Sequence, residues 1–141
     1  MEPRPYRPHH LGRAGEDEAV RFLHSLGYRI CARNWRGSCG EVDVIALSEA
    51  ATATSQRSAL SEISARRAHD EFVFVEVKTR SSTTFGDPFE AITPEKYRRL
   101  YRLAREWIAL NHPRAPWRID VILLLKSVHG FELVHHKGLV A

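Results

Sequence analysis

The fold of this chain is decided by Phe72-Val73-Phe74-Val75-Glu76-Val77-Lys78. Its β-branched and aromatic residues predict a strand that enters the protein core. Side chains alternate between the two faces of a strand, so the three valines should share one face. The opposite face should carry two aromatic and two charged side chains: Phe72, Phe74, Glu76 and Lys78. A carboxylate and an ammonium group therefore stand together at the end of an otherwise apolar strand.

One such charged pair has an ordinary explanation, an ion-paired strand end that rises into solvent. A second apolar stretch, at residues 40–47, favours another interpretation. The same alternation puts Glu41 and Asp43 on one face of this strand. It puts three apolar side chains on the other face: Val42, Val44 and Ala46. Buried charges are costly unless they are paired or bind a metal, so two neighbouring strands with inward carboxylates favour a metal site.

The composition is that of an ordinary soluble domain. The chain has 141 residues, of which 43% are hydrophobic and 27% charged, which predicts a single domain with one core. Its formal net charge of +4 favours an anionic partner only mildly. Two cysteines, Cys31 and Cys39, are too few for a disulfide scaffold and predict free thiols. No apolar leader or membrane span is recognisable, so we expect a cytoplasmic protein with no membrane partner.

Two segments lie outside the expected core. Residues 1–11 are rich in proline and basic side chains and predict a disordered basic tail. Residues 12–141 should form the single domain. Within it, residues at about 48–70 are rich in Ala, Ser and Thr and lose hydrophobic periodicity, which predicts a flexible insertion.

Two helices are expected. Residues 12–26 place apolar side chains at helical spacing: Ala19, Phe22, Leu23 and Leu26. Glu16 lies at the edge of this stripe, although an acidic residue in a first turn can serve only to complement the helix dipole. Thr93-Pro94-Glu95 predicts the start of the second helix, with Thr93 as its N-cap.

The second helix carries a basic face. Its charged residues are Lys96, Arg98, Arg102 and Arg105, and Arg80 follows the central strand. Such a face is usually only solvated. Beside a phosphate-type site, we interpret these five residues as candidate nucleic-acid contacts.

The remaining segments complete an α/β fold. Residues 117–126 contain an unbroken apolar run typical of a strand buried on both faces, and residues 131–136 should form an edge strand. Asp120, at the entrance to the first of these strands, is interpreted as a structural carboxylate. The order α-β-β-β-α-β-β predicts a mixed β-sheet flanked by helices.

The charged residues define a catalytic hypothesis. The candidate catalytic residues are Glu16, Asp43, Glu76 and Lys78. Asp43 and Glu76 offer the hard oxygen ligands that Mg²⁺ or Mn²⁺ prefers. Lys78 would position or deprotonate an attacking water, or stabilise charge on a phosphate, and Glu16 would support the site from the first helix.

These residues also carry a resemblance. Glu16, Gly40-Glu41-Val42-Asp43 and Glu76-Val77-Lys78 resemble the motifs of the PD-(D/E)XK, or restriction-endonuclease-like, superfamily, in particular archaeal Holliday-junction resolvases. Four stretches are similar to the YraN-like family of bacterial proteins: Gly15 to Ala19, Gly40 to Ala46, Phe74 to Arg80, and Phe85-Gly86-Asp87-Pro88. One departure is that Val42-Asp43 replaces the superfamily's Pro-Asp pair and keeps the carboxylate.

The resemblance implies a restriction-endonuclease-like core and a role on nucleic acid. We expect a metal-dependent endonuclease acting on DNA phosphodiesters, with branched DNA as the substrate that the resolvases suggest. They also suggest a homodimer, since a two-fold assembly suits symmetric cutting of two strands. The alternative is a non-catalytic nucleic-acid-binding or accessory protein that retains the nuclease fold.

Overall fold

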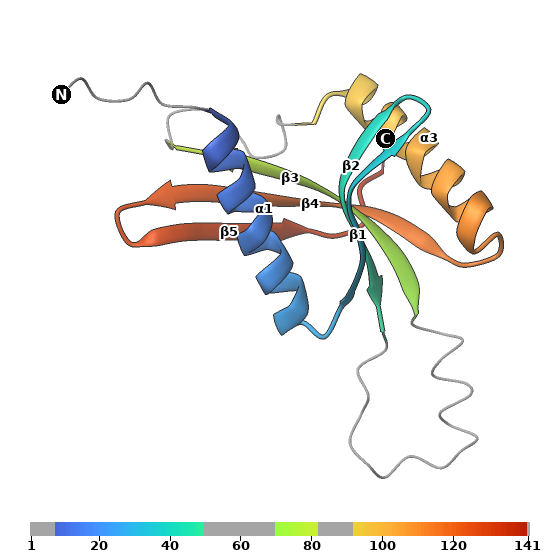
Figure 1. Ribbon diagram of the computed structural model, residues 1–141, viewed down its shortest axis with the longest axis horizontal. Helices are drawn as coiled ribbons and strands as arrows, with labels where there is room; N and C mark the ends of the chain where they lie inside the picture. Colours follow the sequence, from blue (N-terminus) through green and yellow to red (C-terminus); the bar gives the residue numbers. More distant parts are fainter. Residues whose placement is uncertain (1–7, 50–69, 82–91, 141) are drawn as a thin grey trace, which may run out of the picture.

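The computed structural model describes residues 8–49, 70–81 and 92–140 of the chain (Figure 1). Its helices and strands, in order, are α1 (Pro8–Ser25), β1 (Arg29–Gly37), β2 (Gly40–Ser48), β3 (Glu71–Arg80), α3 (Pro94–Asn111), β4 (Trp117–Ser127) and β5 (Gly130–His136). This order confirms the predicted α-β-β-β-α-β-β succession and the mixed α/β class. The assignment to a restriction-endonuclease-like core stays a prediction.

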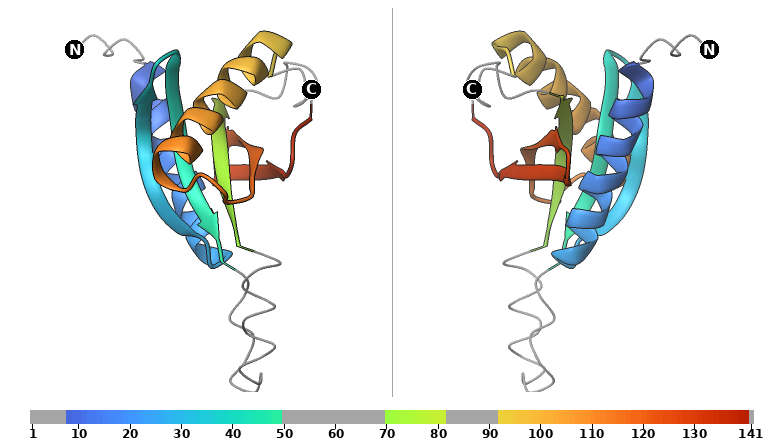
Figure 2. Two further views of the ribbon diagram at one scale, coloured as in Figure 1. Left: turned by 90° about the vertical axis from the view of Figure 1, so that its right-hand side faces the viewer. Right: turned by 90° about the vertical axis from the view of Figure 1, so that its left-hand side faces the viewer.

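The five strands form one mixed sheet in the order β1-β2-β3-β4-β5. Only β3 and β4 run parallel, and the other three neighbouring pairs are antiparallel. The chain passes from β3 to β4 through α3, as a parallel connection requires a crossover. The two helices cover opposite faces of the sheet (Figure 2), and β5 lies at its edge as expected.

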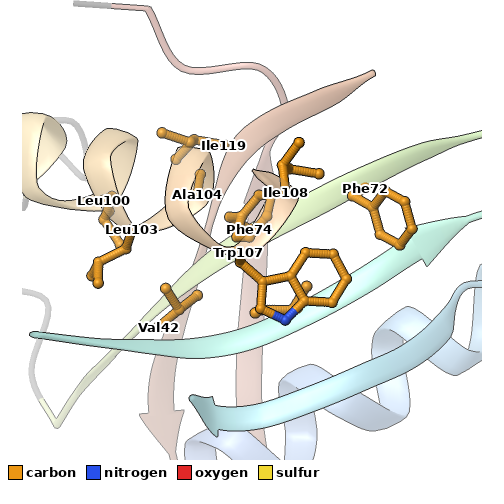
Figure 3. Close-up of a cluster of buried hydrophobic side chains, with 10 residues drawn as sticks. Val42, Phe72, Phe74, Leu100, Leu103, Ala104, Trp107, Ile108 and Ile119 are labelled. Atoms are coloured by element: carbon orange, nitrogen blue, oxygen red, sulfur yellow. The ribbon is translucent and has the colours of Figure 1, made fainter. Parts of the chain in front are cut away.

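Each helix encloses its own hydrophobic core. On one face, α3 packs against Val42, Ile45, Phe72 and Phe74 through four of its apolar residues and the ring of Trp107 (Figure 3). On the other face, Ala19 and Leu23 of α1 pack against six residues of the sheet: Val44, Ala46, Val73, Val75, Ile122 and Leu124. The central strands are therefore buried on both sides, which explains their nearly continuous apolar sequences.

The alternation predicted for β3 is confirmed. Val73 and Val75 lie in the core beneath α1, whereas Phe72 and Phe74 lie in the core beneath α3. Glu76 faces the same side as the two phenylalanines, because it contacts Lys96 of α3.

The alternation predicted for β2 is wrong at Val42. Val44 and Ala46 lie beneath α1, but Val42 lies beneath α3. The change of face occurs at Asp43. The residue at the corresponding register position of β1 is Asn34, whose φ of 51° is unusual for a residue with a side chain. The pairing of β2 with β3 also ends here, at Val44 and Val75, so residues 40–43 of β2 and the residues of β3 from Glu76 onward are not paired with each other.

Helix α1 begins at Pro8, four residues before the predicted start at Gly12. At Gly15, helix α1 lies close against Thr79 of β3. A Cβ atom at this position would collide with Thr79 Oγ1. The absence of a side chain therefore lets the first turns of α1 lie against the end of β3, next to the residues of the candidate site.

Several expectations concern residues outside the described ranges. They include most of the tail, residues 50–69 of the expected insertion, and the Phe85–Pro88 stretch. Within the described ranges, Cys31 and Cys39 are free thiols, as predicted. Neither described helix combines the length and the hydropathy needed to cross a membrane.

Asp120 is fully buried, with 0% of its surface exposed, and holds the end of the sheet together. It receives hydrogen bonds from Arg118 Nε, over 2.9 Å, and from the backbone nitrogen of Gly138, over 2.9 Å. His135 Nε2 lies 2.7 Å from its other carboxylate oxygen. Arg118 continues the network to Glu71 and to the Tyr28 hydroxyl. These contacts support the interpretation of Asp120 as a structural carboxylate.

We expect Asp120→Asn to lower the free energy of unfolding by about 3–5 kcal/mol, because it removes one partner of a buried ion pair. Burial works to raise the pKa of Asp120, but the hydrogen bonds from His135 and Arg118 outweigh it and lower the pKa. The contribution of Asp120 is therefore present above about pH 4 and is lost as the pH falls through the lowered pKa. Urea unfolding at pH 7 measures the change.

Asp17→Asn is the matched control. Asp17 also pairs with an arginine, Arg33, but 54% of its side chain is exposed. This control should cost less than about 1 kcal/mol. Equal effects of the two substitutions would contradict the structural role of Asp120.

Candidate functional site

The candidate site lies where β2 and β3 separate. Here the Asp43 side chain replaces part of the missing strand pairing. The backbone nitrogen of Val77 donates a hydrogen bond to Asp43 Oδ2 over 2.9 Å. Asp43 is thereby held directly beside β3 at Val77, the residue between Glu76 and Lys78.

Glu76 is the centre of an ion-pair cluster. Its side chain is only 8% exposed, and its Oε1 atom lies 2.6 Å from Lys96 Nζ and 3.6 Å from Lys78 Nζ. Lys78 comes from the same strand, two residues on. Lys96 comes from the first turn of α3, where its backbone nitrogen donates to the N-cap oxygen of Thr93 over 3.1 Å. The N-terminus of α3 is thus tied to the end of β3 by a charged contact.

Glu16 reaches the site from α1. Its side chain is 18% exposed, and its Oε2 atom lies 3.8 Å from Arg33 Nη2. Arg33 also binds Asp17, over 2.7 Å, so it is shared between two acidic residues of α1. The close approach at Gly15 places Glu16 here, next to the point where the sheet opens.

The three carboxylates concentrate negative charge around Asp43. Burial is the main cause that raises the pKa of Asp43, and the neighbouring charge of Glu76 raises it further, to about 7. Glu16 acts in the same direction more weakly, whereas the hydrogen bond from Val77 and the charge of Lys96 act against it. The carboxylates are therefore not fully compensated by the two lysines.

The two lysines respond in opposite directions. Burial lowers the pKa of Lys78, and the adjacent Lys96 lowers it further. Burial works to lower the pKa of Lys96 as well, but the hydrogen bond between Lys96 and Glu76 outweighs burial, so the pKa of Lys96 is raised. Lys96 is therefore the lysine that keeps its charge, and Lys78 is the one that loses its proton more easily.

The donor chemistry fits a hard divalent cation. In residues 8–49, 70–81 and 92–140, no three His, Cys, Asp or Glu side chains are close enough together to enclose a metal ion. Mg²⁺ does not need such a cage, because it commonly uses one or two carboxylates and keeps water or substrate phosphate as its other ligands. Asp43 and Glu76 meet this requirement, and a cation there would offset both the burial and the repulsion by Glu76 that raise the pKa of Asp43.

The structure brings the four predicted catalytic residues into one region but divides the predicted nucleic-acid contacts. Lys96 belongs to the carboxylate cluster. Arg98, Arg102 and Arg105 instead line a surface hollow of about 440 Å³ with two tyrosines of α3. Arg80 is exposed at the end of β3. Each of these assignments to nucleic-acid binding stays a prediction.

Three features of the site were not recognised from the sequence. Lys96 was placed on the basic face of the second helix, although the helical start at Thr93 already put it near the N-terminus. No sequence pattern marks Arg33 as part of the site, because its partners Glu16 and Asp17 lie on α1. The third is the ion pair of Glu41, which is expected on the same face as Asp43, with Arg36 over 3.4 Å along the β1–β2 hairpin.

Known proteins with similar sequences were found. The family model "Uncharacterised protein family UPF0102" matches residues 15–124. A UPF0102 protein of Mycolicibacterium smegmatis is 46% identical over 130 residues, which are 91% of this chain and 90% of the relative. A UPF0102 protein of Pseudarthrobacter chlorophenolicus is 41% identical over 127 residues, 89% of this chain and 81% of the relative. One from Mycobacterium sp. strain KMS is 48% identical over 113 residues, 79% of this chain and 70% of the relative.

The raised pKa of Asp43 predicts a stability difference in metal-free protein. Its folded-state pKa of about 7 lies above the ordinary 3.8, so ionisation costs stability as the pH rises from about 4 to 7. We expect Asp43→Asn to raise the free energy of unfolding by about 1–3 kcal/mol at pH 8 in EDTA. This gain should shrink towards pH 4. Chemical unfolding at several pH values measures it, and Asp17→Asn is the exposed control. A destabilised Asp43→Asn protein at pH 8 would contradict the raised pKa of Asp43.

Proposed function

This chain belongs to the uncharacterised protein family UPF0102, the YraN-like family, and we propose from its site that it is a metal-dependent endonuclease that hydrolyses DNA phosphodiesters. The observation that carries the proposal is the meeting of three carboxylates and two lysines at the point where β2 and β3 separate. A protein that only binds nucleic acid has no need of buried carboxylates, since they repel phosphate.

Asp43 and Glu76 would hold the Mg²⁺ or Mn²⁺ ion. When bound, the cation would neutralise the phosphodiester and favour attack by water. Glu16, on α1, would orient a water molecule beside Asp43. Lys96 holds Glu76 Oε1 over 2.6 Å, so Glu76 would bind the cation either through Oε2 or by moving Oε1 away from Lys96.

The opposite pKa shifts suggest a division of work between the lysines. Lys78, whose pKa is lowered, would accept a proton from the attacking water at Nζ. The water oxygen bonds to phosphorus as the bond to the leaving oxygen breaks, and solvent returns a proton to that oxygen. Lys96, whose pKa is raised, would keep its charge and stabilise the negative charge that develops on the phosphate.

One observation favours the alternative, a non-catalytic nucleic-acid-binding or accessory protein with a nuclease fold. Glu76 is already paired with both lysines, so the cluster is partly satisfied within the protein. A structural ion-pair cluster would have the same contacts. We also propose a cytoplasmic location, which suits free thiols and a DNA substrate, and a homodimer, which would present two sites to branched DNA.

Lys78→Met tests the chemistry. We expect it to lower the cleavage rate by about 10²- to 10⁴-fold, because it removes the proton acceptor. DNA affinity should change by less than about threefold, since the residue lies inside the cluster. The assay uses linear, single-stranded, flap and four-way DNA with Mg²⁺ or Mn²⁺, and binding is measured in parallel.

The matched control is Lys137→Met, an exposed residue that follows β5, two strands away from β3 in the sheet. It removes the same charge and should cleave as wild type does. If the wild-type protein binds DNA but cleaves nothing in this panel, the enzyme proposal is excluded and the accessory role replaces it.

Lys96→Met tests the metal ligands without any requirement for cleavage. Lys96 occupies Glu76 Oε1 in the present arrangement, so its removal should free this oxygen. We expect Mn²⁺ affinity to rise by roughly fivefold, the equivalent of about 1 kcal/mol for a partly exposed ion pair. Calorimetric titration measures this, with Lys137→Met as the control. An unchanged or weaker affinity would show that Lys96 does not compete with the metal for Glu76.

A further inference from the structure

The outward face of α3 carries a basic surface that is separate from the carboxylate cluster. Five side chains line its hollow of about 440 Å³: Tyr97, Arg98, Tyr101, Arg102 and Arg105. We call this the Tyr–Arg surface. It combines three positive charges with two aromatic rings on one helix, so its chemistry differs from that of an ordinary solvated helix face.

The aromatic part of this surface is held in place from behind. Tyr101 is 41% exposed, and its ring centroid lies 5.1 Å from that of Trp117 on β4. The Tyr97 ring lies 6.3 Å from the Tyr101 ring. The Tyr97 hydroxyl donates to the backbone oxygen of Leu139 over 3.3 Å. Tyr101 is therefore a supported ring that also faces the hollow.

The arginines of this surface carry uncompensated charge. Among the described residues, no carboxylate lies within 4 Å of Arg98, Arg102 or Arg105. Arginines elsewhere in the described structure are of both kinds: Arg21 and Arg118 form ion pairs, whereas Arg114 has no carboxylate within 4 Å among the described residues. The distinguishing feature of the Tyr–Arg surface is that three such arginines line one hollow. An anion is therefore the complementary ligand, and the guanidinium group suits phosphate in particular.

We propose that the Tyr–Arg surface binds an unpaired stretch of a nucleic-acid strand, with a base stacked on Tyr101 and phosphates on the arginines. A supported aromatic ring between phosphate-binding side chains is the combination that single-stranded nucleic acid requires. The bases inside a duplex are stacked on both sides, so a duplex could offer a base face to Tyr101 only at its two ends, whereas an unpaired strand offers one at every nucleotide. This inference deepens the proposed function by naming a substrate class that contains unpaired nucleotides.

The position of the surface suits that role. Tyr101 follows Lys96 by five residues on α3, which is roughly 7.5 Å along the helix axis and roughly 140° around it. A strand held at Tyr101 would therefore pass around the N-terminal end of α3, by way of Tyr97, to reach the side on which Lys96 contacts Glu76. The same helix would hold the unpaired segment and contribute Lys96 to the carboxylate cluster.

The test is a binding measurement in EDTA, so that it does not depend on metal or cleavage. Fluorescence anisotropy compares a single-stranded 15-mer with a blunt duplex of the same sequence. We expect Tyr101→Ala to weaken single-strand binding between about fivefold and hundredfold and duplex binding less than twofold. Tyr101→Phe should bind as wild type does. Tyr101→Leu fills the space against Trp117 without an aromatic ring and should lose affinity as Tyr101→Ala does, which separates stacking from folding.

The arginines provide a second arm. The double variant Arg98→Gln/Arg102→Gln should weaken binding of both DNA forms and reduce the salt slope by roughly one to two. Arg21→Gln/Arg29→Gln removes the same charge at exposed arginines of α1 and β1 and should leave binding unchanged.

Three results would overturn the inference. They are a folded Tyr101→Leu protein with wild-type single-strand affinity, an equal loss on duplex DNA, or Tyr101-dependent binding of an acidic peptide in place of DNA. If the dependence on Tyr101 holds but no substrate is cleaved, the endonuclease proposal fails and the binding surface stands. If substrates are cleaved but neither binding nor cleavage depends on Tyr101, the binding surface fails and the endonuclease proposal stands.

Discussion

The hydrogen bond from the Val77 nitrogen to the Asp43 carboxylate is the contact on which the candidate site depends. Regular pairing of β2 with β3 ends at Val44 and Val75, and backbone groups beyond that point need other partners. Asp43 supplies one of them. In doing so its carboxylate is drawn in beside Glu76, and the β1–β2 hairpin turns away from β3 (Figure 1). The opening in the sheet and the gathering of acidic groups thus have one structural origin.

This arrangement has an electrostatic cost. Three carboxylates and two lysines share a partly buried region, and the pKa of Asp43 rises to about 7 as a result. A fold selected only for stability would replace such a cluster with apolar residues, because buried ion pairs seldom repay their desolvation. Strain of this kind is typical of functional sites, where stability is given up for chemistry. The neighbouring Asp120 cluster is different, because its contacts lower the pKa of Asp120 and support the sheet.

The fold was largely predictable from local patterns, whereas the site was predictable only in part. Alternation along β3 and the Thr93 cap of α3 are encoded within a few residues, and both are confirmed. The change of face at Asp43 was missed, because it accompanies a positive φ at Asn34 on another strand. Lys96 was assigned to an outer face for a similar reason, since its partner Glu76 lies twenty residues earlier in the chain. Contacts between elements leave no periodic signal in either sequence.

The central claim is that Asp43 and Glu76 hold a divalent cation. The most direct measurement is the anomalous difference density of Mn²⁺ in crystals of the wild-type protein at pH 8. The account predicts a peak between these two carboxylates, within about 2.0–2.3 Å of an oxygen of each, with Lys96 Nζ moved away from Glu76. An intact contact between Lys96 and Glu76, with no peak beside Asp43, would contradict it.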